Sequence, residues 1–430
     1  MSFLGFSAGL PFLLVFSTLS AWLRDSGVTL SVIGFFSWVG LTYSIKVIWA
    51  PVIDKLRLPF LTKRLGKRRS WMLLAQVGIA AGLMVLAELD PLTQIELIAL
   101  TAVGIAFCSA TQDIVIDAYR IEAIEPEYQA AMAATYVFGY RVALLVSGAG
   151  AFYIAEYIGW NAAYSAMALF MFIGMVATLV SSEPKHQDNQ ASADLEAKIE
   201  STLGVQAHSS LFQRLSAWFS GAVIAPFAEF FVRNGKLGIW ILALIALYKM
   251  SDITMGVMAN PFYLDLGFSK TDIADVSKIF GFFMTIFGAV LGGVLVIRYG
   301  LMKPLLLGAI LVASTNLLFV LLAVSEPNLK LLALVISADN LSGGIATSVF
   351  IAYLSSLTNS AYTATQYALF SSLMTLPAKL MGGLSGLIVD SFGYASFFLY
   401  ASSVGLPAII LVIVLMRMQE PAQNEPYPNK

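Results

Sequence analysis

Charge is scarce in this chain. Only 12% of its 430 residues are charged, whereas 58% are hydrophobic, and an ordinary soluble domain carries about 25% charged residues. The net charge is −1, and no Lys/Arg tract is interleaved with aromatic residues, which argues against nucleic acid as a partner. The composition therefore points to a membrane protein.

Side chains for catalysis are scarce as well. The only histidines, His186 and His208, fall in one polar segment, and the single cysteine, Cys108, lies in an apolar run. Neither a zinc site nor a histidine base is thus available within the membrane, and an internal disulfide would need a second cysteine. No Gly-rich phosphate loop is present, so nothing indicates an ATP-driven pump. We predict a protein that is not an enzyme and holds neither metal nor cofactor.

Apolar sequence is abundant, in blocks long enough to cross a bilayer about 30 Å thick. The breaks between these blocks predict twelve spans, with a long gap after the sixth. The predicted fold class is an all-α polytopic membrane protein with twelve transmembrane helices in two six-helix halves. The spans are 3–23, 31–54, 70–88, 97–119, 128–155, 160–181, 238–263, 271–297, 304–324, 330–357, 364–389 and 393–416.

The spans divide the chain into four predicted parts. These are an N-terminal half at 1–183, a cytoplasmic linker at 184–236, a C-terminal half at 237–418 and a cytoplasmic tail at 419–430. Within the linker, apolar residues recur at helical spacing over 211–232, which predicts an interfacial amphipathic helix; a thirteenth span is the alternative. With both termini inside, 17 Lys/Arg lie on the cytoplasmic side and 3 on the other, as the positive-inside rule expects.

Some charges nevertheless fall within the predicted spans. A charge facing lipid costs roughly 3 kcal/mol, so these groups must pair with one another or line a shared aqueous cavity. Asp113 and Asp117 are four residues apart, which puts them on one helix face with Ser109. The embedded cations are Lys46, Arg141, Lys249, Lys278 and Lys379, and the acids are Asp113, Asp117, Asp252 and Asp339.

For charges deep in the spans, two functional assignments each have a simpler structural alternative. Lys249 and Asp252 are three residues apart, so they either neutralise each other or contact a substrate. Arg141 is predicted to contact an anion, and the alternative is a structural counter-ion for Asp113. Asp339 lies in the fourth span of the second half, as Asp113 does in the first, and we expect the two acids at matching places.

Other charges lie near the predicted cytoplasmic ends of their spans. Asp54 precedes the basic loop Lys55–Arg69 and is predicted to be a gate or a structural clamp, not a binding group. Asp117 with Arg120 and Glu122 is predicted to form a cytoplasmic salt-bridge cluster that serves as a gate, and the alternative is substrate binding.

Several short segments, spread over both halves, form a specific pattern when taken together. They are Gly5–Pro11, Ile33–Ser37, Lys46–Asp54, Ala106–Ala118, Gly139–Arg141, Val146–Gly148, Leu247–Asp252 and Ala364–Ala368. With these segments the chain resembles AmpG-type muropeptide permeases of the major facilitator superfamily. The resemblance covers nearly the whole chain apart from the linker.

The resemblance implies proton-coupled import of GlcNAc-1,6-anhydroMurNAc peptides across the bacterial inner membrane by alternating access. This transport serves peptidoglycan recycling, whose product feeds β-lactamase induction. We expect a multi-pass monomer in the lipid bilayer, with a sugar-peptide as its substrate and the proton gradient as its energy source. The alternatives are transport of another anionic solute, such as a siderophore or an acyl-CoA-like molecule, and, more remotely, a membrane-embedded transferase, for which the outer loops are too short.

Roles for individual residues follow from this substrate. Cations suit its carboxylates, and amides suit sugar hydroxyls. Proton coupling is predicted for Asp113, Asp339 and Asp252; substrate binding for Arg141, Lys249, Lys379, Lys46, Lys278, Gln112, Asn340 and Gln366; and gating for Asp54, Asp117 and Arg120.

Overall fold

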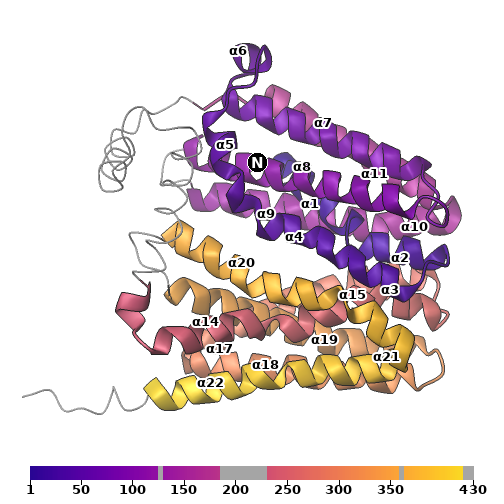
Figure 1. Ribbon diagram of the computed structural model, residues 1–430, viewed down its shortest axis with the longest axis vertical. Helices are drawn as coiled ribbons and strands as arrows, with labels where there is room; N and C mark the ends of the chain where they lie inside the picture. Colours follow the sequence, from indigo (N-terminus) through magenta and orange to yellow (C-terminus); the bar gives the residue numbers. More distant parts are fainter. Residues whose placement is uncertain (124–128, 185–229, 358–362, 420–430) are drawn as a thin grey trace, which may run out of the picture. The chain divides into compact units, whose positions relative to one another are not determined.

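The computed structural model describes residues 1–123, 129–184, 230–357 and 363–419 (Figure 1). All regular structure in these residues is helical, and ten stretches are long and apolar enough to cross a membrane. The shorter apolar stretch Leu30–Ser44 and helix α20 (Thr363–Gly382) lie at the predicted second and eleventh spans. The predicted all-α polytopic fold is confirmed. The helix predicted at 211–232 lies almost wholly outside the described residues.

The chain forms two compact units. The first contains Met1–Val28 and the described residues from Val39 to 184, and the second contains Thr29–Trp38 and the described residues from 230 onward. The segment Thr29–Trp38 therefore packs with the second unit, although it lies within the first half of the sequence. The predicted part boundaries themselves stay a prediction.

In the first unit, long apolar helices pack side by side. Helix α1 packs along α9, and α7 packs along both α8 and α11 (Figure 1). The helices are α1 (Ser2–Leu14), α2 (Ser17–Asp25), α4 (Leu41–Ser44), α5 (Ala50–Lys55), α6 (Leu61–Leu65), α7 (Lys67–Glu88), α8 (Ile95–Glu122), α9 (Gln129–Leu145), α10 (Ala151–Tyr157) and α11 (Trp160–Val180), with the 3₁₀ turn η2 (Lys46–Ile48) and the π-helix η4 (Val146–Gly150). The 3₁₀ turn η1 (Ser37–Gly40) contains the boundary between the two units, after Trp38.

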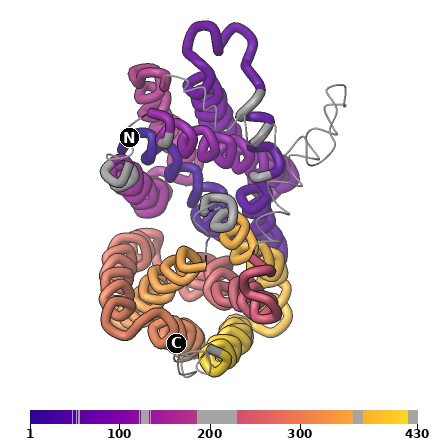
Figure 2. Tube along the Cα trace, turned by 90° about the vertical axis from the view of Figure 1, so that its left-hand side faces the viewer, coloured from indigo at the N-terminus to yellow at the C-terminus, as the bar shows by residue number. Residues whose placement is uncertain are grey.

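In the second unit, α17 packs along α19, and α22, yellow in Figure 2, packs along α14 and α18. The helices are α3 (Leu30–Phe36), α14 (Leu237–Tyr248), α15 (Met250–Asp265), α16 (Lys270–Asp272), α17 (Gly281–Tyr299), α18 (Met302–Ala323), α19 (Leu329–Ser356), α20 (Thr363–Gly382), α21 (Ser385–Val404) and α22 (Leu406–Gln419), with the π-helix η5 (Ile273–Phe280).

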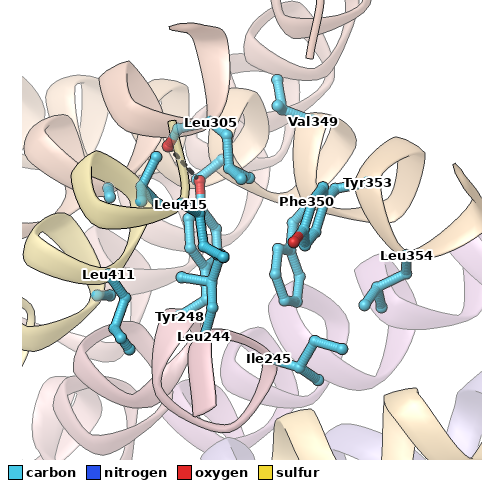
Figure 3. Packing of buried hydrophobic residues seen from close by; sticks show 14 of the residues in the cluster. Leu244, Ile245, Tyr248, Leu305, Val349, Phe350, Tyr353, Leu354, Leu411 and Leu415 are labelled. Atoms are coloured by element: carbon cyan, nitrogen blue, oxygen red, sulfur yellow. Dashed lines mark hydrogen bonds between the residues drawn. The ribbon is translucent and has the colours of Figure 1, made fainter. Parts of the chain in front are cut away.

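The core of the second unit surrounds Tyr248. Its ring stacks on Phe350 with centroids 4.3 Å apart, and its hydroxyl donates a 3.0 Å hydrogen bond to the Leu305 carbonyl (Figure 3). Leu244 and Leu415 are fully buried in the same cluster. Because a buried tyrosine hydroxyl needs a partner, this bond fixes the end of α14 against α18, immediately before Lys249.

The predicted second span is not one continuous helix. Residues 31–54 form α3, η1, α4, η2 and α5 in succession. Between α4 and η2 the backbone at Ile45 has φ −102° and ψ 6°, outside the α region, and the turn at η2 closes with i→i+3 bonds such as Ile48 N–H to the Ile45 carbonyl. Hydrophobicity predicted that this stretch crosses the membrane, but hydrophobicity alone does not show where a helix is broken.

A glycine separates the last two predicted spans. Gly393 has φ +76° and interrupts α21, so the residues before it complete the eleventh span and those after it begin the twelfth. The predicted boundary between residues 389 and 393 therefore coincides with a real break, because glycine adopts positive φ at little cost.

Both units end their first span in the same way. Gly27 and Gly267 have φ +89° and +90°. The following amides bond back across the helix end, Val28 N–H to the Leu23 carbonyl at 3.0 Å and Phe268 N–H to the Tyr263 carbonyl at 3.2 Å. This is the Schellman pattern of a helix C-terminus, and its recurrence supports the internal repetition expected of two related halves.

Candidate functional site

In the first unit the polar residues gather around Asp113. Asp113 is partly buried on α8, and its Oδ1 atom is inaccessible and makes no hydrogen bond within the described residues. The carboxylate lies within electrostatic range of Lys46 and Asp117. Leaving a buried acceptor unpaired costs about 1–3 kcal/mol, so this position is suited to bind a group that the protein itself does not supply.

Lys46 is brought to α8 by the break in the second span. Trp49, just after η2, donates a 3.2 Å hydrogen bond to the Thr111 hydroxyl and packs on Phe107 with ring centroids 4.9 Å apart. These contacts hold the segment after η2 against α8 at Thr111, two residues before Asp113. The broken helix therefore positions a cation beside the acid.

Three tyrosine side chains interact electrostatically with the same carboxylate. Tyr43 on α4 and Tyr136 and Tyr140 on α9 are all within electrostatic range of Asp113, and the rings of Tyr136 and Tyr140 are 6.2 Å apart. Tyr140 is also within range of Arg141. The negative charge of Asp113 and the positive charge of Arg141 thus have opposite electrostatic effects on Tyr140.

Arg141 is exposed although it lies inside the candidate membrane span Thr135–Tyr157. An arginine facing hydrocarbon is costly, so we expect its side chain to reach water or a polar partner. Among the described residues, neither Arg141 nor Lys46 has a carboxylate partner within 4 Å. The predicted role of Arg141 as counter-ion to Asp113 therefore has no direct contact to support it, and its predicted role in anion binding stays a prediction.

Gln112 lies on another face of α8. It is fully buried, and neither amide atom has a hydrogen-bond partner among the described residues. Its helix face continues that of Cys108, whose Sγ would meet a Cβ added at Gly78 of α7. The predicted contact of Gln112 with sugar stays a prediction.

An aromatic group adjoins the Asp113 site. The rings of Phe12 and Phe16 are 5.0 Å apart, and each lies within 6 Å of the Tyr43 ring, at 5.9 and 5.8 Å. Phe16 sits at the break between α1 and α2, where φ is −123° and ψ is −105°. The helix interruption therefore brings three half-buried rings together near the carboxylate.

The charges at the predicted cytoplasmic end form a separate cluster. Arg120 pairs with Asp117 at 3.6 Å, and its guanidinium lies 5.9 Å from the Tyr136 ring centroid. Glu122 accepts from Arg68 Nε at 2.9 Å and from Arg68 Nη2 at 2.5 Å. The predicted gating roles of Asp117 and Arg120 stay predictions, but the Asp117–Arg120 ion pair is present.

Arg68, Arg69 and Glu183 are members of this cluster that sequence reasoning missed. Arg68 is only 8% exposed. Glu183 accepts the backbone amides of Arg68 and Arg69 at 2.7 and 3.1 Å, which caps the N-terminus of α7. The sequence signal for this helix start was Gly66, which immediately precedes the basic run. Its φ is +88°, and helix α7 begins at the next residue.

In the second unit, Lys249 lies at the junction of α14 and α15. Its ammonium bonds to Asp252 and, at 2.9 Å, to the Thr347 hydroxyl of α19. Asp339 accepts a 3.4 Å hydrogen bond from Thr315 and lies within electrostatic range of both Asp252 and Lys249. The mutual neutralisation of Lys249 and Asp252 is thus observed, and a substrate role for either residue is not thereby excluded.

A hollow opens beside this ion pair. It is small, with about 10 Å³ of room for water, and Lys249, Ser251 and Asp252 contribute its polar lining. Gly308 also lines it, and a Cβ there would lie 2.7 Å from the Tyr248 hydroxyl. The hollow depends on that glycine.

The other predicted residues of the second unit are engaged within it. Lys278 donates to the Asn260 amide oxygen at 2.9 Å from the π-helix η5. Asn340 accepts from Thr285 at 2.9 Å and donates to the Ile336 carbonyl at 3.0 Å. Lys379 lies in the last turn of α20 and is partly buried.

Two predicted residues cannot be placed. The side chains of Asp54 and Gln366 lie outside the described residues, although their backbones belong to α5 and α20.

The two acids expected at matching places lie at different depths. Asp113 is the nineteenth residue of the 28-residue helix α8, whereas Asp339 is the eleventh of the 28-residue helix α19. With the helix starts aligned, Thr347 corresponds to Asp113. Counted from the helix starts, Asp339 thus lies eight residues earlier in α19 than Asp113 does in α8, which is about 12 Å along each helix's own axis. The expected matching of the two acids stays a prediction.

These features define a multi-pass membrane transporter with a charged interior and helices broken at the polar sites. The model of the Major Facilitator Superfamily matches residues 1–264 and 241–430. The Anhydromuropeptide permease of Escherichia coli (strain K12) is 35% identical over 97% of this chain and 79% of the relative. The Putative transporter AmpG 4 of Rickettsia conorii is 31% identical over 96% and 94%.

A solved structure of the peptide transporter POT has the same fold. It superposes with a TM-score of 0.69 at 13% identity over 97% of this chain and 93% of that one. The chain belongs to the AmpG family of permeases within the major facilitator superfamily. It is a transporter and not an enzyme.

Proposed function

We propose that this protein imports GlcNAc-1,6-anhydroMurNAc peptides across the bacterial inner membrane, with both termini in the cytoplasm, as a proton-coupled monomer. The observation that carries the proposal is the similarity to an anhydromuropeptide permease over nearly the entire chain. The excess of Lys/Arg on the predicted cytoplasmic side supports the orientation. The substrate serves peptidoglycan recycling.

The chemistry of the described residues supports a substrate of this type. Arg141 and Lys46 are cations without an ion pair within 4 Å among the described residues, and they suit the carboxylates of a peptide. The rings of Phe12, Phe16 and Tyr43 suit the apolar face of a sugar. Asp113, Asp252 and Asp339 are the acids available for proton coupling.

The test is uptake of labelled anhydromuropeptide into inverted and right-side-out vesicles, with and without a proton uncoupler. We expect accumulation in right-side-out vesicles that collapses when the uncoupler is added. No uptake of this substrate, with uptake of another anionic solute, would contradict the substrate. Accumulation that is insensitive to the uncoupler would contradict proton coupling alone.

A further inference from the structure

We propose that the loop at residues 56–66 docks onto an anionic phospholipid surface, with the Phe60 ring in the membrane interface and the neighbouring cations on lipid phosphates. The loop joins α5 to α7 and contains α6. Helix α7 is itself the candidate membrane span Lys67–Glu88, so the loop lies where the chain enters a membrane crossing. Figure 1 shows α6 projecting away from α7. The inference is independent of the substrate that the transporter carries.

A strained turn holds Phe60 outward. Its φ of 60° and ψ of −48°, with a 2.7 Å hydrogen bond from the Leu61 amide to the Pro59 carbonyl, define a γ-turn of the rare form with positive φ. Bulky residues seldom adopt positive φ, and such strain is characteristic of functional positions. The Phe60 side chain is 85% exposed. Because aromatic rings are enriched at membrane interfaces, the turn presents a ring that a bilayer surface would stabilise.

Two leucines extend the apolar surface around Phe60. Leu56 and Leu61 are 50% and 37% exposed. The base of the loop is fixed to the following helix, because the Trp71 indole of α7 donates a 2.9 Å hydrogen bond to the Leu56 carbonyl. The apolar side chains therefore project from a loop that is held at its base, and they would enter the interface together.

Exposed cations flank these apolar side chains. They are Arg57, Lys63 and Arg64. None of the three has a carboxylate partner within 4 Å among the described residues, and the sequence contains no acid from residue 55 to residue 87. Arg68 and Arg69, in contrast, turn toward the protein, on Glu122 and on carbonyls at the end of α11. The basic run thus divides into an inward part and an outward part.

An anionic membrane surface suits the cations and the apolar side chains at once. Each Lys or Arg close to anionic headgroups strengthens binding about fivefold, and apolar side chains enter the interface beside them. The linker segment 188–200 is the other acidic partner within this chain, with Asp188, Asp194, Glu196 and Glu200. Its mostly polar and small side chains would pair with the cations but offer little cover for Phe60. Lipid is therefore the favoured occupant.

The test is amide hydrogen exchange of the full-length protein in nanodiscs, which expose both membrane faces to solvent. Phosphatidylglycerol nanodiscs are compared with phosphatidylcholine nanodiscs, the latter also with added inorganic phosphate. We expect loop 56–66 to exchange about tenfold more slowly in phosphatidylglycerol, since three cations contribute, and inorganic phosphate to have no effect. Because salt screens exposed charges, raising it from about 0.1 M to about 1 M should remove most of the difference.

Two variants separate the charges from the ring. The triple variant Arg57→Gln, Lys63→Gln and Arg64→Gln should exchange at the same rate in both lipids. Phe60→Ser should exchange faster than the native loop in both lipids, yet keep part of the preference for phosphatidylglycerol, because the cations remain. Native exchange over Lys67–Glu88 verifies that each variant is folded.

A matched control removes three exposed cations of the second unit. It is the triple variant Lys236→Gln, Lys303→Gln and Lys330→Gln. Because it changes the net charge equally but leaves the loop intact, the native difference between the lipids should persist.

Four results would overturn the proposal. They are equal exchange of the native loop in the two lipids, a preference for phosphatidylglycerol that survives loss of the three loop cations, and native exchange in Phe60→Ser. The fourth is slowing by inorganic phosphate in phosphatidylcholine, which would indicate a phosphate site and not a membrane surface. Faster exchange of the loop when the four linker acids are replaced by amides would assign the cations to the linker and likewise contradict a lipid partner.

Discussion

Asp390 caps helix α3 through Ser31, which lies 359 residues earlier in the chain. Its Oδ2 atom accepts a 2.8 Å hydrogen bond from the backbone amide of Ser31 and a second bond from the Ser31 hydroxyl. Thr29, the N-cap residue of α3, makes no side-chain cap of its own. The N-terminus of α3 therefore takes its carboxylate from α21.

Replacing this acid should loosen α3 locally. A lost helix cap costs about 1 kcal/mol, so Asp390→Ala should speed amide hydrogen exchange over Leu30–Phe36 about fivefold. Asp390→Asn keeps one acceptor oxygen and should have a smaller effect. Exchange in Asp390→Ala equal to that of the native protein would show that the contact adds no stability to α3.

A methyl group at Gly386 should be far more damaging. A Cβ there would lie 1.7 Å from the Leu30 carbonyl oxygen, a backbone atom that can move only with α3. Gly386→Ala should therefore separate α3 from α21, lower the melting temperature and abolish uptake.

Gly104→Ala is the matched control, because a Cβ at Gly104 meets nothing within 4 Å. It should leave melting and uptake near the native values. Native uptake in Gly386→Ala would mean that close packing of these two helices is not needed.

The pair of Lys249 and Asp252 should show strong coupling in a double-mutant cycle. Their side chains are 12% and 31% exposed, so either one left alone carries a largely desolvated charge. Lys249→Ala and Asp252→Ala should each destabilise by about 1–3 kcal/mol, and the double variant by less than their sum. The measurement is thermal or denaturant unfolding in detergent, and additive effects would contradict the coupling.

The hydrogen-bonded ion pair of Arg68 and Glu122 should stabilise the first unit. Arg68 is nearly inaccessible, so Glu122→Ala should cost about 1–3 kcal/mol by removing its carboxylate partner. Glu96→Ala, on the same helix but exposed, should cost less than about 0.5 kcal/mol. Equal melting temperatures for the two variants would contradict a stabilising role for the pair.

Asp339→Asn tests where the proton is carried. Without an ionisable group at this position, gradient-driven accumulation should be lost while exchange of internal for external substrate continues. Both activities are measured in the same vesicles with labelled anhydromuropeptide. Uncoupler-sensitive accumulation in this variant would remove Asp339 from the coupling step.

Hydrophobicity predicted the fold well because a bilayer imposes one length on every span. The same signal missed the breaks. At Ile45 and Phe16 the helix stops without a proline or glycine at that position, since tertiary contacts such as Trp49 to Thr111 decide where it does so. Proline does not mark the breaks either, because Pro11 and Pro261 lie inside continuous helices.

The sequence indicated which charged residues lie inside the spans, but not how they are arranged or paired. The cost of a charge in lipid identified Asp113, Arg141 and Lys249 without any structure. It did not reveal which charges are paired, because Lys249 and Arg141 are equally cationic in sequence. Burial of Arg68 was missed for the same reason, since a basic run beside a span is usually a solvated loop.

The matched corners at Gly27 and Gly267 show that one backbone path can carry different chemistry. Counting back fifteen residues from each glycine leads to Phe12 in the first unit and Asp252 in the second. At the same distance from the same corner, one unit therefore places an aromatic ring and the other a charged group.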